Sequence, residues 1–179
     1  MHKKKTKKDK EEIVFGAILT QRTNWKNVEL ALRNLKKAGV LSIEKIYQAG
    51  KKNLKLIESL IRPSGFYKQK AKRLFQLCEF IIENCGTLEN FFSKDLRSCR
   101  KQLLKIYGIG PETADSILLY AGDLPIFVID EYTRRFVKKH HIENKFSYDY
   151  LQQLFQQNLP KEIKIYQDFH ALIVLEGKP

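Results

Sequence analysis

The sequence is short of cysteines and of long apolar runs, and each shortage excludes a class of protein. Three cysteines occur in the 179 residues, an odd number within helical patterns, which argues against a disulfide framework: Cys78, Cys85 and Cys99. We expect them to be buried free thiols. No stretch approaches the roughly 18 to 20 apolar residues of a membrane span, and the lysine-rich start lacks the apolar stretch of a signal peptide. We therefore expect a soluble, cytoplasmic protein with no membrane partner.

Common catalytic signatures are also missing. The sequence contains no P-loop and no HExxH motif. The adjacent His140 and His141 do not present one shared helix face, because neighbouring residues on a helix point in different directions. No catalytic metal is therefore predicted.

The charge is strongly of one sign. Lysine and arginine number 33 against 20 acidic residues, which gives a net charge of +13 and a pI near 9.6. Such a surface favours a polyanionic partner. The first ten residues supply +5 of this charge and leave +8 for the remainder. We interpret residues 1–12 as a flexible basic tail, which either stays solvated or attracts phosphates without specificity.

The hydrophobic pattern predicts an all-α fold. Apolar residues recur at helical spacing in Val28, Leu32 and Leu35, and again from Leu74 to Ile81. A hydrophobic content of 43% is enough for a core of ordinary size. Turn-forming residues predict helix breaks at Gly39 and at residues 62–65, 84–87, 108–111 and 122–125.

The most informative stretch is residues 103–130, in which a Gly-x-Gly turn opens a predicted helix. Gly108 and Gly110 permit positive φ and let backbone amides approach a ligand, and Pro111 suits the first helical position. The free amides around Glu112 and Thr113 could then hold a phosphate oxygen. The alternative is an ordinary tight turn between two amphipathic helices.

Asp130 follows the turn by twenty residues and comes directly after the apolar run 126–129. That run would bury the backbone and place the carboxylate at a helix start. Cleavage of an N-glycosidic bond builds positive charge on the sugar, which a fixed anion stabilises. The alternative role is helix capping, and both roles are compatible because a capping carboxylate is still negative.

Segment 103–135 resembles the helix-hairpin-helix DNA glycosylases, the superfamily of endonuclease III. IYGIGPETAD stands where that family has its hairpin, and VIDEYTRR where it has its catalytic aspartate. Residues 16–32 and 62–74 are similar to two DNA-facing segments of the family, most closely in the 3-methyladenine DNA glycosylase III branch, which removes alkylated purines. The resemblance runs from about Ile13 to Lys178.

The resemblance implies two helical subdomains with a DNA-binding cleft between them. Residues 24–128 would form a continuous subdomain that contains the helix-hairpin-helix. Residues 13–23 and 129–179 would form the second subdomain. Asp130 would then be the catalytic residue at the cleft.

The resemblance also assigns residues to DNA and to the damaged base. Gln21 would enter the space of a flipped nucleotide, with a surface glutamine as the alternative. Trp25 would face the extruded base, with a core tryptophan as the alternative. Gly108, Gly110 and Thr113 of the hairpin would bind the phosphate backbone of the DNA. So would Tyr67, Lys68 and Lys70, for which plain solvated surface is the alternative.

Two departures from the family pattern bear on mechanism. Bifunctional members carry a lysine two residues after the second hairpin glycine, whose amine forms a Schiff base. This chain has Glu112 there, which predicts water as the nucleophile and no lyase activity. Many relatives also hold a [4Fe-4S] cluster on four cysteines located after the segment matching HALIVLEGKP. None of the three cysteines lies there, so we expect no cluster and no other cofactor.

The sequence thus predicts a monomeric, nucleoid-associated glycosylase of base excision repair. It would hydrolyse the N-glycosidic bond of a damaged, alkylated base in double-stranded DNA. A nonenzymatic helix-hairpin-helix DNA-binding module is one alternative. A glycosylase for oxidised or mismatched pyrimidines is the other.

Overall fold

The structure, a computed structural model, describes residues 4–178, and all regular structure in that part of the chain is helical. The all-α prediction is confirmed. The first α-helices are α1 (Lys7–Leu19), α2 (Trp25–Lys37), α3 (Ile43–Lys52), α4 (Lys55–Leu60), α5 (Tyr67–Cys85) and α6 (Leu88–Phe92). The others are α7 (Leu96–Leu103), α8 (Pro111–Ser116), α9 (Glu131–Lys139), α10 (Tyr148–Asn158) and α11 (Ile163–Glu176). A 3-10 helix, η1 (Arg62–Ser64), precedes α5, and a π-helix, η2 (Ile117–Ala121), continues α8.

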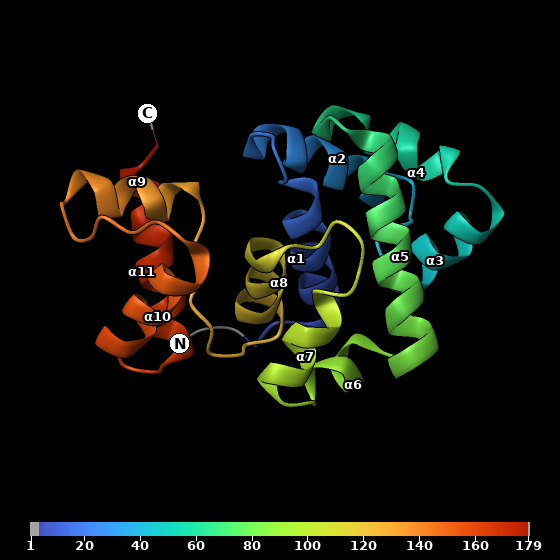
Figure 1. Cartoon of the computed structure of the whole chain (residues 1–179). Helices are drawn as coiled ribbons and strands as arrows, with labels where there is room; N and C mark the ends of the chain where they lie inside the picture. The colour runs from blue at the N-terminus through green and yellow to red at the C-terminus, as the bar shows by residue number, and fades with distance from the viewer. Residues whose placement is uncertain (1–3, 179) are drawn as a thin grey trace.

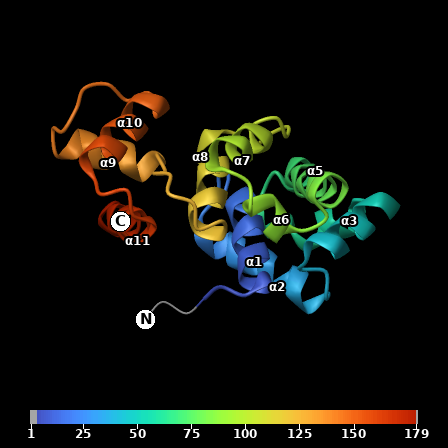
Figure 2. The same cartoon turned by 90° about the horizontal axis from the view of Figure 1, so that it is seen from below.

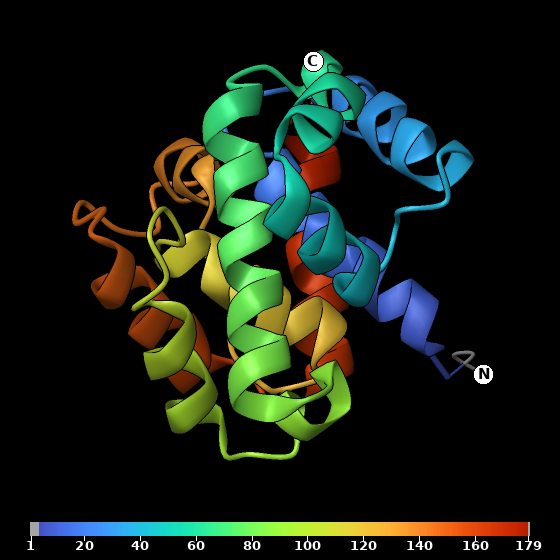
Figure 3. The ribbon, with the colours of Figure 1, turned by 90° about the vertical axis from the view of Figure 1, so that its right-hand side faces the viewer.

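The helices form two groups (Figures 1 and 2). Helices α1 to α8 make the larger group, and α9, α10 and α11 lie beside it as a smaller group. Residues 122–130 connect the two. Seen from the side, α5 runs along one face of the larger group with α1 behind it (Figure 3). None of the helices within residues 4–178 is long and apolar enough to cross a membrane.

Helix α1 belongs to the larger group, which corrects the predicted subdomain boundary. The sequence placed residues 13–23 with the carboxyl-terminal helices. In the structure α1 packs against α2, α5 and η2. The reason is its apolar face, because Phe15, Ile18 and Leu19 are all fully buried among these helices.

The predicted flexible tail is also corrected. Helix α1 already starts at Lys7, since Thr6 and Asp9 form a capping box at its first turn. Lys7 forms an ion pair of 2.6 Å with Glu44, and the buried Glu11 accepts the backbone N–H of Ile43. Residues 7–12 are therefore folded, and residues 1–3 of the predicted tail lie outside the described residues.

Local chemistry explains where most helices begin and end. Of the predicted breaks, Gly39 and residues 122–125 lie between helices, 84–87 and 108–111 overlap the end of α5 and the start of α8, and 62–65 contains η1. Polar side chains accept an N–H of the first turn at the start of α2, α3, α6, α7 and α9: Asn24, Ser42, Thr87, Asp95 and Asp130. Of the cysteines, Cys78 and Cys99 are buried as expected, while Cys85 is half-buried, and all three are free thiols.

A buried carboxylate joins the two groups of helices. Asp115 of α8 has no exposed surface. Its oxygens accept from Nε and Nη2 of Arg100 in α7, at 2.7 and 3.1 Å. They also accept from two side chains of α10, the Tyr148 hydroxyl at 2.8 Å and Gln152 Nε2 at 2.7 Å. Burial and the charge of Asp115 raise the pKa of Tyr148 far above its usual range, so the phenol stays a donor.

We expect Asp115→Ala to destabilise the fold by about 3 kcal/mol, because it leaves buried donors of Arg100, Tyr148 and Gln152 without their acceptor. Asp168→Ala is the matched control, since Asp168 is exposed and lies 3.9 Å from Lys164. That control should cost about 0.5 kcal/mol or less. Urea unfolding of both variants measures the difference, and similar midpoints would contradict the prediction.

Candidate active site

Asp130 is the N-cap residue of α9 and follows four buried residues, 126–129. Its Oδ1 accepts the backbone N–H of Thr133 at 2.7 Å and the Thr133 hydroxyl at 2.9 Å. Its Oδ2 lies 3.3 Å from Nε2 of His170 in α11. The capping role is therefore real, and it leaves the second oxygen free of the cap.

The surroundings of Asp130 favour its ionised form. Burial alone would raise the pKa of this carboxyl. The nearby His170 and the two donors of Thr133 outweigh burial, so the pKa of Asp130 is lower than usual. Asp130 is thus an anion at neutral pH, held in a mostly buried position.

A second carboxylate, Glu112, stands at the first turn of α8. Although its side chain is exposed, the protein around it raises the pKa of Glu112, and the negative charge of Asp130 raises it further. Arg134 and His170 act in the opposite direction. Glu112 and Asp130 therefore belong to one electrostatic site.

The hairpin between α7 and α8 has the predicted position, but its glycines differ. Gly108 has a φ of +80°, and the guanidinium of Arg73 packs where a Cβ would stand. Gly110 is the N-cap residue of α8 with a φ of −88°, so only Gly108 uses the positive φ that both glycines permit. An extended backbone suits this position because it lets Pro111 start the helix. A Cβ on Gly110 would meet nothing within 4 Å.

Gln21 contacts two other predicted site residues, Gly108 and Thr113. Its Nε2 donates to the carbonyl of Gly108 at 3.0 Å and to the Thr113 hydroxyl at 2.9 Å. Its Oε1 accepts from Nη1 of Arg73 at 2.5 Å. Gln21 is half-buried, and its entry into DNA stays a prediction. Because the Thr113 hydroxyl faces Gln21, the backbone amide is the group of Thr113 that remains for a ligand.

The turn before α5 corrects the role expected for Lys70. Its side chain is 1% exposed, and Nζ donates to the carbonyls of Leu19 and Ser64 at 2.9 and 2.6 Å. Burial, helped by the charge of Arg73, lowers the pKa of Lys70 to about 8. Lys70 therefore holds two turns together and offers no surface to DNA. Of its neighbours, Lys68 is exposed and Tyr67 is half-buried.

Two aromatic side chains stand out at the surface. Trp25 is 54% exposed, with Nε1 donating to Glu29 at 3.0 Å, so the alternative of a core tryptophan is wrong. Phe66 is 57% exposed and has a φ of +44°, a left-handed conformation that costs energy in a bulky residue. Phe66 was not predicted from the sequence, because neither feature can be read from residue order.

His170 and Tyr120 were missed as well. His170 is 7% exposed, and its Nδ1 lies 2.6 Å from the Tyr120 hydroxyl. The sequence did contain one signal, because His170 begins HALIVLEGKP. That segment resembles the one that precedes the cluster cysteines in relatives. Nothing in the sequence singles out Tyr120.

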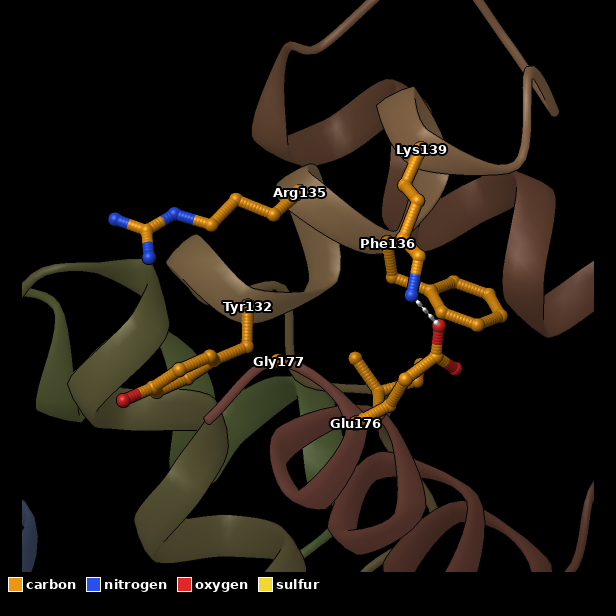
Figure 4. A pocket seen from close by; sticks show the side chains of 7 residues that line it. Tyr132, Arg135, Phe136, Lys139, Glu176 and Gly177 are labelled. Carbon is orange, nitrogen blue, oxygen red and sulfur yellow. Dashed lines mark hydrogen bonds and ion pairs between the residues drawn. The ribbon is translucent and has the colours of Figure 1, made fainter. Parts of the chain in front are cut away.

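A surface hollow lies elsewhere, between α9 and α11 (Figure 4). Tyr132, Phe136 and Gly177 line it, and Lys139 and Glu176 form an ion pair of 2.7 Å at one side. No predicted site residue is among its lining residues. Among residues 4–178 no group of three His, Cys, Asp or Glu side chains could hold a metal ion. The absence of an iron-sulfur cluster stays a prediction.

Two groups of helices, a hairpin and a buried aspartate at a helix start together define an endonuclease III-like, helix-hairpin-helix protein. The family comparison agrees, since residues 15–161 match the family described as HhH-GPD superfamily base excision DNA repair protein. The chain belongs to this superfamily and is a DNA glycosylase by family.

Similar proteins cover most of the chain. A protein of Methanocaldococcus jannaschii, provisionally named a DNA repair glycosylase, is 50% identical over 166 residues, 91% of this chain and 74% of that protein. The crystal structure of H. pylori 3-methyladenine DNA glycosylase (MagIII) bound to 1,N6-ethenoadenine gives a TM-score of 0.82 at 35% identity. That match covers 91% of this chain and 82% of the other. A non-covalent endonuclease III-DNA complex gives 0.75 at 20% identity over 97% and 73% of the two chains, and this shows the fold alone.

The hairpin geometry predicts that the same substitution has different effects at its two glycines. Gly108→Ser should destabilise the protein by about 1 to 2 kcal/mol, because a non-glycine residue is strained at positive φ and its Cβ collides with Arg73. Gly110→Ser should change stability by less than about 0.5 kcal/mol, since serine is a good N-cap residue. Urea unfolding compares them, and equal losses would be inconsistent with this geometry.

Proposed function

We propose that the protein hydrolyses the N-glycosidic bond of an alkylated purine in double-stranded DNA, as a monomer and with water as the nucleophile. The observation that carries the proposal is Asp130, an ionised and mostly buried carboxylate at a helix start. Membership of a base excision repair superfamily supports cleavage of an N-glycosidic bond as the reaction in which this carboxylate takes part.

Asp130 would act by electrostatics. Loss of the base leaves oxocarbenium-like positive charge on the deoxyribose, and a fixed anion lowers the free energy of that transition state. The anion would also orient the attacking water. Because Thr133 already holds Oδ1, Oδ2 is the oxygen that would face the sugar.

DNA would be held by the hairpin and by the turn before α5. The amides near Gly108, Gly110 and Thr113 would contact phosphates, and the exposed Lys68 would add charge. Gln21, now bound to the hairpin, would exchange those hydrogen bonds for an orphaned base. Membership of a base excision DNA repair superfamily supports this partner.

An alkylated base is the favoured substrate because of Trp25. Its exposed ring can stack on an extruded base, and alkylated purines often carry a positive charge that an indole attracts. The MagIII structure, which is 35% identical to this chain, holds 1,N6-ethenoadenine, a modified purine. This supports a purine rather than a pyrimidine.

We expect Asp130→Asn to abolish base release while leaving duplex affinity within a few-fold, since it removes the anion and no phosphate contact. Single-turnover release of methylated purines from duplex DNA measures the first effect, and a binding titration the second. Asp149→Asn is the control, because Asp149 is an exposed aspartate in the first turn of α10. Near-normal base release by Asp130→Asn would remove it from the catalytic role. No release by the wild type from any lesion would instead support a nonenzymatic DNA-binding module.

We also expect borohydride to trap no covalent complex between the wild-type protein and damaged DNA, with strand breaks only after alkali. Glu112 has no amine and cannot form an imine. The Glu112→Lys variant tests the position itself, because its amine should give a trapped adduct on DNA with an abasic site. A wild-type adduct would overturn the assignment of water as nucleophile, and its mapped lysine would name the group responsible.

A further inference from the structure

Three side chains from separate elements form a chain of contacts that ends at Asp130. The Tyr120 hydroxyl of η2 lies 2.6 Å from His170 Nδ1, and His170 Nε2 lies 3.3 Å from Asp130 Oδ2. His170 is 7% exposed, and its Nε2 is buried with no aligned hydrogen bond among the described residues. A buried ring nitrogen that lies 3.3 Å from a carboxylate oxygen without a hydrogen bond of its own needs an explanation.

Tyr120 determines which ring nitrogen of His170 carries the proton. Burial raises the pKa of Tyr120 far above its usual range, and the charges of Asp130 and Asp168 raise it further. The phenol therefore keeps its hydrogen, which it can donate to Nδ1, its neighbour at 2.6 Å. A neutral imidazole that accepts at Nδ1 carries its own hydrogen on Nε2, which is the nitrogen facing Asp130.

The backbone around this chain is specialised. Tyr120 lies in the π-helix η2. π-Helical turns are rare overall, and those that occur are often found at functional sites. Helix α11 is tied to the same segment, because Gln167 Nε2 donates to the carbonyl of Leu119 at 2.8 Å. Gln167 and His170 are three residues apart and so lie on one face of α11. The bond from Gln167 therefore helps fix where His170 points.

We propose that His170 is a positioning residue for Asp130, held by Tyr120 so that its Nε2 stays beside Oδ2. Thr133 holds one oxygen of the carboxylate and His170 faces the other. The plane of the carboxylate is thereby fixed before DNA arrives, and its negative charge is favoured in a mostly buried place. This role rests on the proposed function, in which Asp130 is the stabilising anion.

The proposal has a pH signature. The titratable groups that act on Asp130 or on which it acts are His170 from α11, Tyr120 from η2 and Glu112 from α8, and Glu112 is in turn influenced by Glu131 and Arg134 from α9. Removing His170 removes a donor to the carboxylate and leaves burial and Glu112, which both oppose its charge. The pKa of Asp130 then rises. Since activity requires the anion and is lost as pH falls through that pKa, the acid limb of the rate profile moves to higher pH.

The experiment measures single-turnover base release against pH for the wild type, His170→Leu, His170→Gln, Tyr120→Phe and the control His141→Gln. His141 is exposed. We expect His170→Leu to lose about tenfold to hundredfold in rate at neutral pH, the size of a charge-assisted hydrogen bond. Its acid limb should move up by about one pH unit, with duplex affinity within a few-fold. His170→Gln, which keeps an N–H donor, should recover part of both effects.

Tyr120→Phe should give a smaller loss of the same kind, because the imidazole loses the partner that fixes its tautomer. His141→Gln should match the wild type. An acid limb that His170→Leu leaves in place would overturn the proposal. Should that variant fail to fold by circular dichroism, nitrogen NMR of the wild-type imidazole decides. The proton is expected on Nε2, and a neutral ring protonated on Nδ1 would overturn the proposal.

The Asp130→Asn variant distinguishes failure of the proposed function from failure of the role proposed for His170. If Asp130→Asn still releases base, the proposed function loses its anion. If it is inactive while His170→Leu keeps the wild-type rate and pH profile, the positioning role of His170 alone is wrong.

Discussion

The buried carboxylate of Asp115 is the constraint on which the arrangement of the two helix groups depends. A carboxylate without exposed surface is tolerable only when its oxygens are fully hydrogen-bonded, and the donors come from α7 and α10. Gln152 donates from the same amide to the carbonyl of Phe127, so the connection between the groups is tied in as well. The position of Asp130, three residues beyond Phe127, depends on these hydrogen bonds of Asp115 and Gln152.

The site is built outward from that fixed connection by polar side chains that lie mostly inside the protein. Thr133 and His170 lie at Asp130 and Tyr120 contacts His170, while Gln21 and Arg73 brace the hairpin. Few of these groups are free to reorient without breaking several hydrogen bonds. Electrostatic stabilisation of a transition state depends on such preorganisation, because dipoles that must reorient during the reaction lower its free energy less.

Local chemistry was readable from the sequence, and tertiary chemistry was not. Helix breaks, the Asp130 cap and the hairpin position follow from glycine, proline and capping side chains, whose effects reach only a few residues. The capping box of Thr6 and Asp9 was readable too, but the lysines around it suggested a flexible tail. The burial of Lys70, the contact of His170 with Asp130 and the extended backbone of Gly110 depend on partners or conformations that residue order does not reveal.

The enclosed ammonium of Lys70 changes how the protein's charge should be counted. When a basic protein binds a nucleic acid, each cation that neutralises a phosphate releases counterions and steepens the dependence of affinity on salt. Lys70 takes no part in this exchange, because Nζ donates to carbonyls of two turns and is shielded from solvent. Arg100 is likewise matched by a buried carboxylate. The 33 lysine and arginine residues therefore outnumber the cations that could neutralise phosphates of a polyanion.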